Sequence, residues 1–137
     1  MILEFVKDNL LLFAVAVTSG AMLIWPMLRR TGGGPAATTL QATQMINRQD
    51  AVVVDVREDP EYAKGHVMGA RHIPLSQFSA RAGELQKFKS KPLIAYCESG
   101  TRSGQAVAVL RKQGFEQVFN LTGGFAAWQQ AGLPVEK

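Results

Sequence analysis

The residue types best suited to chemistry lie together in one short segment that contains the only cysteine of the chain, Cys97-Glu98-Ser99-Gly100-Thr101-Arg102-Ser103. An apolar run over residues 92–96 precedes it and a helical pattern over residues 105–110 follows it, which predicts a strand, a tight loop and a helix. Backbone N–H groups of such a loop and the start of the helix stabilise a negative sulfur. A helix start stabilises a nearby negative charge by up to about 2 kcal/mol, and one pKa unit corresponds to about 1.4 kcal/mol. The helix start alone is therefore enough to lower the pKa of the thiol by about one unit. We therefore predict that Cys97 is a reactive nucleophile rather than an inert core residue.

The single cysteine limits the covalent chemistry that the chain can perform. It excludes an internal disulfide and a cysteine-rich zinc site, and neither a metal nor a cofactor is predicted. Any covalent state formed at Cys97 must therefore be discharged to an acceptor outside the chain. The formal net charge of +4 comes from scattered basic residues without a long Lys/Arg run, so nucleic acid is not an expected partner.

The N-terminal part of the chain contains a long apolar segment. Residues 9–28 carry no charge, and about 20 helical residues are enough to cross a bilayer core. Trp25 lies near the end of this segment, and Arg29 and Arg30 follow it. The acidic Glu4 before the segment and the lack of a small-x-small cleavage site after it argue against a cleaved signal peptide. The pattern predicts one transmembrane helix over residues 9–28, in contact with a lipid bilayer.

Charges around the apolar segment predict its orientation. Lys7 on one side against Arg29 and Arg30 on the other favours a single-pass protein of a bacterial-type inner (plasma) membrane, with its C-terminal part in the cytoplasm. A free reactive thiol also suits a reducing compartment. Ala16 and Gly20 are four residues apart and could admit a second helix, from a membrane-protein partner or from another copy of the chain.

The rest of the chain predicts a Gly/Pro linker over residues 31–37 and one folded domain over residues 38–137, after a membrane anchor over residues 1–30. Short strands are predicted over residues 38–40, 52–54, 71–73, 93–96 and 117–120. Helices are predicted over residues 41–48, from Asp59-Pro60 with Asp59 as the cap, and over 80–88, 103–113 and 124–131. Strands that alternate with helices indicate an α/β fold with a mainly parallel sheet flanked by helices. Ligands bind beyond the carboxyl ends of such strands, which is where Cys97 is expected.

Three groups of residues, taken in order, resemble the rhodanese family. The first group comprises Asp55-Val56-Arg57-Glu58, Glu61-Tyr62, Gly65-His66-Val67-Met68-Gly69-Ala70 and Ile73-Pro74. The second is the segment from Cys97 to Ser103, which resembles the active loop of that family. The third is Gly123-Gly124-Phe125-Ala126-Ala127-Trp128, followed by Gly132-Leu133-Pro134-Val135. With its apolar N-terminal segment, the chain resembles a membrane-anchored single-domain rhodanese.

The resemblance implies a thiosulfate or persulfide sulfurtransferase. Cys97 would take sulfane sulfur from a donor, hold it as a persulfide and pass it to a thiol or cyanide acceptor. Loop N–H groups from Glu98 to Ser103 would stabilise the persulfide, and Gly100 would allow the tight turn. Arg102 would orient the loop or the donor, or pair with an acid of the domain. The hydroxyls of Ser99, Thr101 and Ser103 would act as donors or caps, and a capping role is favoured for Ser103.

Several polar residues have two possible roles. Glu98 would repel a dianionic donor such as thiosulfate if it faced the pocket, whereas an orientation to solvent would make the effect small. Asp55 and Arg57 could line the pocket, but a buried ion pair that braces the turn is favoured. His66 and His72 are interpreted as hydrogen-bonded structural residues rather than as bases.

Two other functions remain possible at this point. A phosphatase or arsenate reductase is disfavoured, because four residues separate Cys97 from Arg102 and the related phosphatases have one residue more. The other alternative is a tethered docking module for a membrane or cytosolic protein.

Overall fold

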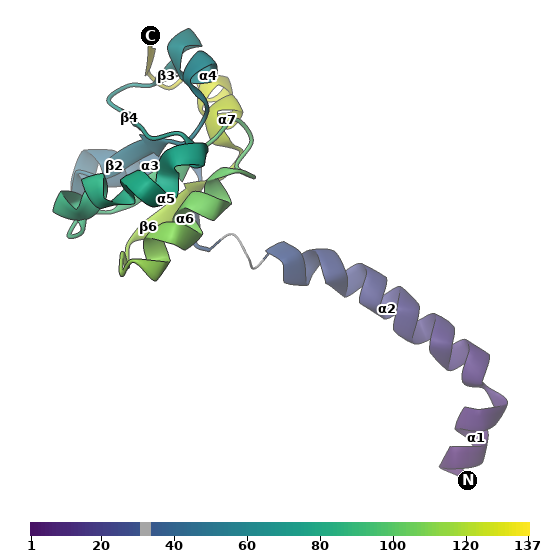
Figure 1. Cartoon of the computed structure of the whole chain (residues 1–137). Coiled ribbons are helices and arrows are strands. Elements are labelled where there is room, and N and C mark those ends of the chain that lie inside the picture. The colour runs from purple at the N-terminus through teal and green to yellow at the C-terminus, as the bar shows by residue number, and fades with distance from the viewer. Residues whose placement is uncertain (31–33) are drawn as a thin grey trace. The chain divides into compact units, whose positions relative to one another are not determined.

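The computed structural model describes residues 1–30 and 34–137, with the side chains of residues 27–30 excepted, and divides the chain into the units Met1–Gly32 and Gly33–Lys137 (Figure 1). Part of the predicted linker, residues 31–33, and the side chains of Arg29 and Arg30 therefore lie outside the description. The remaining linker residues lead into the sheet, because Ala36 and Ala37 form its first strand.

The N-terminal unit consists of two helices, α1 (Ile2–Asp8) and α2 (Leu10–Arg30). The chain bends by 81° at Asn9, whose side-chain amide donates to the carbonyl of Phe5 at 2.8 Å. Among the described residues, no single helix has the length and hydropathy of a membrane span, and α1 and Leu10–Pro26 reach them only together, as a bent pair. The single transmembrane helix predicted over residues 9–28 is therefore not confirmed.

The second unit contains a parallel five-stranded sheet. Its strand order is β1 (Ala36–Ala37), β6 (Val118–Leu121), β5 (Leu93–Tyr96), β2 (Val52–Asp55) and β4 (Arg71–His72). The central pair is in register from Val52 opposite Leu93 to Asp55 opposite Tyr96. All four residues of β5 are buried, as expected for a strand that is covered on both faces.

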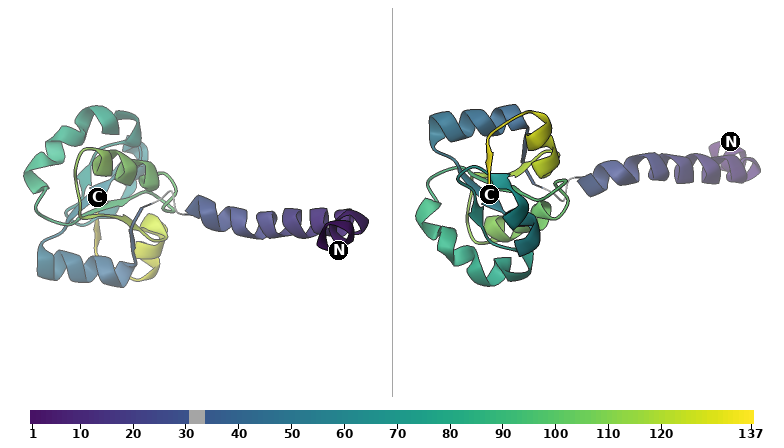
Figure 2. Two further views of the ribbon diagram at one scale, coloured as in Figure 1. Left: turned by 90° about the horizontal axis from the view of Figure 1, so that it is seen from below. Right: turned by 90° about the horizontal axis from the view of Figure 1, so that it is seen from above.

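Helices cover both faces of this sheet (Figure 2). On one side lie α5 (Leu75–Arg81), the 3-10 helix Ala82–Phe88 and α6 (Ser103–Lys112), and on the other lie α3 (Thr39–Gln49) and α7 (Gly124–Gln130). Side chains of β5 alternate between the two cores: Leu93 packs with the α5 and α6 side, and Ile94 with the α3 and α7 side. The predicted α/β class with a mainly parallel sheet flanked by helices is confirmed.

A smaller layer completes the domain. The helix α4 (Asp59–Lys64) leads to β3 (His66–Val67), which pairs antiparallel with β7 (Val135–Glu136). Glu58, and not Asp59 as predicted, is the N-cap of α4, because Glu58 is the last residue with extended backbone. It forms a capping box with Glu61, and Pro60 is tolerated in the first turn.

Two further predicted elements are wrong in their position. The strand expected over residues 38–40 is a helix start: Thr38 caps α3 through a capping box with Gln41, in which the two backbone–side-chain bonds measure 3.2 and 2.9 Å. The helix expected over residues 80–88 begins earlier, at Leu75, and becomes 3-10 from Ala82. The reason is an apolar stripe at helical spacing that already starts at Leu75 and continues through Phe78. The other predicted strands and helices agree within one or two residues.

Candidate active site

The segment from Cys97 to Ser103 forms a loop between the carboxyl end of β5 and the start of α6. Gly100 has a φ of +99°, and a Cβ atom there would lie 3.3 Å from the carbonyl oxygen of Leu121. The loop thus needs glycine at this position for its backbone conformation and for its close contact with the end of β6. This is the strand–loop–helix junction that the sequence predicts.

The sulfur of Cys97 lies inside this loop, and the residue is fully buried. The N–H of Gly100 donates to Sγ at 3.1 Å, and the hydroxyl oxygen of Ser103 lies 3.5 Å from Sγ. Burial raises the pKa of Cys97, but hydrogen bonds from the Ser103 hydroxyl and from the backbone N–H groups of Ser103, Gly100 and Ser99 lower it by more. The net pKa of the thiol is below its ordinary value, as a nucleophile requires.

Arg102 pairs with an acid, which is one of the two roles that the sequence left open. Its two terminal nitrogens donate to the two carboxylate oxygens of Glu61 on α4, at 2.9 and 2.8 Å. Hydrogen bonding from Arg102 lowers the pKa of Glu61 to about 2, and the same pairing raises the pKa of Arg102. This bidentate ion pair ties the active loop to α4.

Asp55 and Arg57 form the buried ion pair that the sequence favours. The Nε and Nη2 atoms of Arg57 donate to the carboxylate of Asp55 at 3.1 and 2.8 Å, and both residues are almost completely buried. The same carboxylate accepts the hydroxyl of Tyr96 at 2.6 Å, and Arg57 donates to the carbonyl of Gly65 at 2.6 Å. The pair therefore joins the ends of β2 and β5 to the turn before β3.

Glu98 occupies an intermediate position between the two expected ones. Its side chain is 50% exposed, and its carboxylate pairs with Nη1 of Arg57 at 3.2 Å. It also lines a pocket of about 210 Å³ beside the loop, together with Arg57, Glu61, Lys64, Gly65, Phe125 and Gln129. The acid thus faces the pocket, with part of its charge compensated by Arg57.

The hydroxyl-bearing residues of the loop differ in their surroundings. Ser99 and Thr101 are exposed, and their hydroxyl oxygens lie 3.4 Å apart. Ser103 is buried and is the first residue of α6, so the predicted capping role is wrong: Arg102 occupies the N-cap position. The Ser103 hydroxyl lies instead between Cys97 and Asn120.

Two residues that hold the loop were not singled out from the sequence as site residues, namely Asn120 and Glu61. The Asn120 side chain donates to the carbonyl of Gly100 at 2.8 Å and accepts the Ser103 hydroxyl at 2.6 Å. One signal was present, because Asn120 is a polar residue at the carboxyl end of a predicted strand, at the same sheet edge as Cys97.

The start of α7 completes the support of the loop. The N–H groups of Phe125 and Ala126 donate to the carbonyls of Cys97 and Glu98 at 2.8 and 3.1 Å. A Cβ atom on Gly124 would collide with the carbonyl of Cys97 and the backbone of Glu98, so glycine permits this close approach.

The two histidines have structural contacts, in line with the sequence interpretation. The rings of His66 and His72 stack on Tyr62, with centroids 3.9 and 4.2 Å away. Nε2 of His72 is 2.7 Å from the carbonyl oxygen of Arg57. Within the described residues, no group of three or more His, Cys, Asp or Glu side chains is placed to hold a metal ion.

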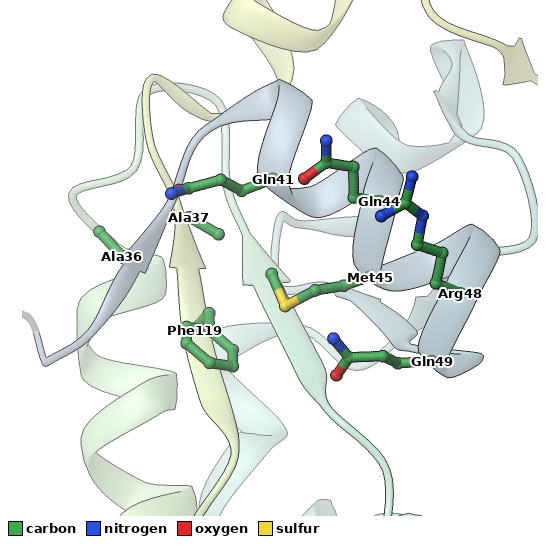
Figure 3. Close-up of a pocket in the computed structure, with 8 residues that line it drawn as sticks. All are labelled: Ala36, Ala37, Gln41, Gln44, Met45, Arg48, Gln49 and Phe119. Carbon is green, nitrogen blue, oxygen red and sulfur yellow. The ribbon is translucent and has the colours of Figure 1, made fainter.

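A second hollow of about 300 Å³ lies between α3, β1 and β6, and Figure 3 shows its lining side chains, among them Met45 and Phe119. No residue of the active loop lines it.

The groups that face the Cys97 sulfur are N–H and O–H donors, so the loop is suited to hold a negatively charged sulfur atom, either a thiolate or a persulfide.

The sequence and the fold match known proteins. Residues 38–131 match the model of the rhodanese-like domain family. Protein YibN of Escherichia coli (strain K12) is 38% identical over 84% of this chain and 81% of its own length. A sulfurtransferase of Allochromatium vinosum is 37% identical over 67% of this chain and 84% of its own length.

YqhL of Bacillus subtilis is 46% identical over 57% of this chain, and the alignment spans only 60% of its own length. Among solved structures, the rhodanese-like domain of the Anabaena sp. protein Alr3790 superposes with a TM-score of 0.67 and 33% identity, covering 74% of this chain and 78% of that one. The chain belongs to the rhodanese-like domain family.

Proposed function

We propose that this protein is a sulfurtransferase that carries sulfane sulfur as a persulfide on Cys97. The observation that carries the proposal is the position of Sγ inside a loop whose Gly100 N–H and Ser103 hydroxyl lie 3.1 and 3.5 Å from it. A persulfide is a negative group, and preorganised donors stabilise it without a general base. Sulfurtransferase-named relatives support the same activity.

The reaction has two steps, and both are displacements at sulfur. In the first, the Cys97 thiolate attacks the sulfane sulfur of a donor, and the bond between that sulfur and the rest of the donor breaks. With thiosulfate, sulfite leaves with the electron pair and Cys97 becomes a persulfide anion. In the second, a thiolate or cyanide attacks the outer sulfur, and the electron pair of the S–S bond returns to Cys97. No external oxidant or reductant is needed.

The surroundings of Cys97 favour one class of donor over another. The sulfur is buried, so the donor must present a single protruding sulfur atom at the mouth of the loop. The half-exposed carboxylate of Glu98 lines the adjacent pocket and repels a dianion, although Arg57 compensates part of its charge. A persulfide of a small thiol or of a protein is therefore the proposed donor, with thiosulfate as a weaker substitute.

Phosphatase or arsenate reductase activity has less support. A phosphate-binding loop uses its arginine to hold the oxyanion. Here both terminal nitrogens of Arg102 are engaged by Glu61 at 2.9 and 2.8 Å. The short spacing between Cys97 and Arg102 points in the same direction.

We further propose that residues 1–30 attach the domain to the inner (plasma) membrane, with the domain on the cytoplasmic side. The support is the uncharged stretch 9–28, and for the orientation the balance of Lys7 before it against Arg29 and Arg30 after it. Membrane fractionation and a topology reporter fused after Lys137 test this. Recovery in the soluble fraction, or a reporter signal from the far side of the membrane, contradicts it.

Sulfur transfer is tested with the full chain in detergent. The protein is incubated with thiosulfate or with a low-molecular-weight persulfide, and its intact mass is measured before and after addition of cyanide. We expect one added sulfur atom on the wild type, its loss to cyanide, and no addition on Cys97→Ser. If neither donor loads Cys97 while cross-linking recovers a membrane or cytosolic protein, a docking function replaces this proposal.

A further inference from the structure

Asn120 lies on β6 and holds the active loop through two hydrogen bonds. The direction of its side chain follows from the alternation of side chains along that strand. Phe119 lies on the α3 side of the sheet (Figure 3). The next residue, Asn120, therefore points to the opposite side, where α6 begins. There its amide contacts Gly100, in the middle of the loop, and Ser103, at the end of the loop.

The orientation of the Asn120 amide is determined by its partners. The carbonyl of Gly100 can only accept a hydrogen bond, so the Nδ2 group must face it, at 2.8 Å. The Oδ1 atom is then directed at Ser103, 2.6 Å away. A carbonyl oxygen can only accept, and consequently the Ser103 hydroxyl must be the donor in this contact.

Ser103 has one hydroxyl proton and two possible acceptors for it. The contact with Asn120 Oδ1 is 2.6 Å, whereas the distance to Cys97 Sγ is 3.5 Å. With a neutral thiol, the proton is therefore directed to Asn120, and the serine oxygen presents a lone pair towards the sulfur. A negative sulfur is a stronger acceptor and competes for the same proton.

We propose that Asn120 is a positioning residue that holds the hydroxyl proton of Ser103 away from the sulfur until Cys97 carries a negative charge. Ionisation of the thiol then rotates the hydroxyl from Asn120 to Sγ, at the cost of the Asn120 contact. Asn120 thus limits how much Ser103 stabilises the charged sulfur. The proposal deepens the proposed function, but its consequence is measured on the resting thiol, so its failure and a failure of sulfur transfer are observed separately.

A double-mutant cycle tests this competition. The acid dissociation constant of Cys97 is measured from the ultraviolet absorbance of the thiolate against pH in the full chain, and Cys97→Ser serves as the blank. We expect Ser103→Ala to lower the dissociation constant about threefold in the wild type, where Ser103 must give up its hydrogen bond to Asn120 in order to donate to the thiolate. In an Asn120→Leu background we expect Ser103→Ala to lower it about tenfold, because Ser103 there donates to the thiolate without giving up another hydrogen bond. The effect of the serine must depend on residue 120.

A second background keeps the test decisive if Asn120→Leu does not fold, as judged by circular dichroism. In Asn120→Asp the carboxylate holds the Ser103 proton more tightly than the amide does. We then expect Ser103→Ala to change the dissociation constant by less than about twofold. The proposal is overturned if Ser103→Ala has the same effect in all folded backgrounds, since a residue that merely braces the loop gives additive changes. A larger effect in Asn120→Asp than in the wild type also overturns it.

Discussion

The active loop is held from two sides that use different interactions. On the β6 and α7 side, the contacts are neutral: Asn120 binds the loop through Gly100 and Ser103, and backbone N–H groups of α7 bind the carbonyls of Cys97 and Glu98. On the β2 and α4 side, they are ionic: Glu61 pairs with Arg102. Neutral hydrogen bonds at fixed backbone positions determine the geometry of the loop around the sulfur, whereas the strength of an ion pair depends on pH and salt. The geometry around the sulfur and the attachment of the loop to α4 are therefore controlled by different interactions.

The largest effect on stability is expected at the buried ion pair of Asp55 and Arg57, on the ionic side of the loop. Asp55→Asn removes the buried charge beside Arg57 and leaves the half-exposed Glu98 as its acidic partner, and loss of one partner of a buried pair costs about 3–5 kcal/mol. Urea unfolding of the full chain measures this loss. The matched control is Asp50→Asn, which breaks the exposed pair with Lys91 and should change stability little. Equal effects of the two variants would contradict a supporting role for the buried pair.

The neutral side is broken most directly at Gly124. An alanine there meets the carbonyl of Cys97, and its φ is +60°, so strain and overlap together should cost about 3 kcal/mol. Gly132→Ala is the control, since its φ is +70° but no atom lies within 4 Å of the added Cβ; about 1 kcal/mol is expected. Thermal unfolding and persulfide loading are the measurements. If the two variants lose the same stability, the close approach of α7 to the loop has no energetic role.

The ionic side should respond to acid. The pKa of Glu61 is about 2 in the folded protein against 4.5 for the free group, so its pairing stabilises the fold above pH 4.5 and is lost as the pH falls towards 2. Because a third of the side chain is exposed, the expected contribution at pH 7 is about 1 kcal/mol. Urea unfolding should show Glu61→Gln less stable than wild type at pH 7 and equal to it near pH 2. A difference that persists at pH 2 would contradict the ion-pair explanation.

The sequence predicts the neutral and ionic supports to different extents. The strand before Cys97 and the helix from Ser103 follow from local apolar patterns, and Gly123 and Gly124 indicate a close approach before α7. The pairing of Asp55 with Arg57 was also foreseeable, because the two residues are only two positions apart where one strand ends. The general principle is that local spacing predicts local structure.

Contacts between distant segments could not be predicted in the same way. The partner of Arg102 lies 41 residues away on α4, and the partner of Ser103 lies 17 residues away on β6. Ser103 was expected to cap α6 because hydroxyls commonly do so at helix starts. Ser103 instead donates to Asn120 across the sheet edge. Which residue lies beside Ser103 depends on the strand order, which apolar spacing does not encode.

The smallest effect is expected at Glu98, where the ionic side meets the pocket. Glu98→Gln removes a charge beside the loop while Arg57 keeps its partner Asp55, so loading of Cys97 from thiosulfate should become about threefold faster at low salt. At 1 M salt the screening length is about 3 Å, and the gain should disappear. The matched control is Glu116→Gln, an equal change in net charge at the amino end of β6, away from the carboxyl edge that holds Cys97. A gain that survives high salt, or one that Glu116→Gln reproduces, would show that the local field of Glu98 does not select the donor.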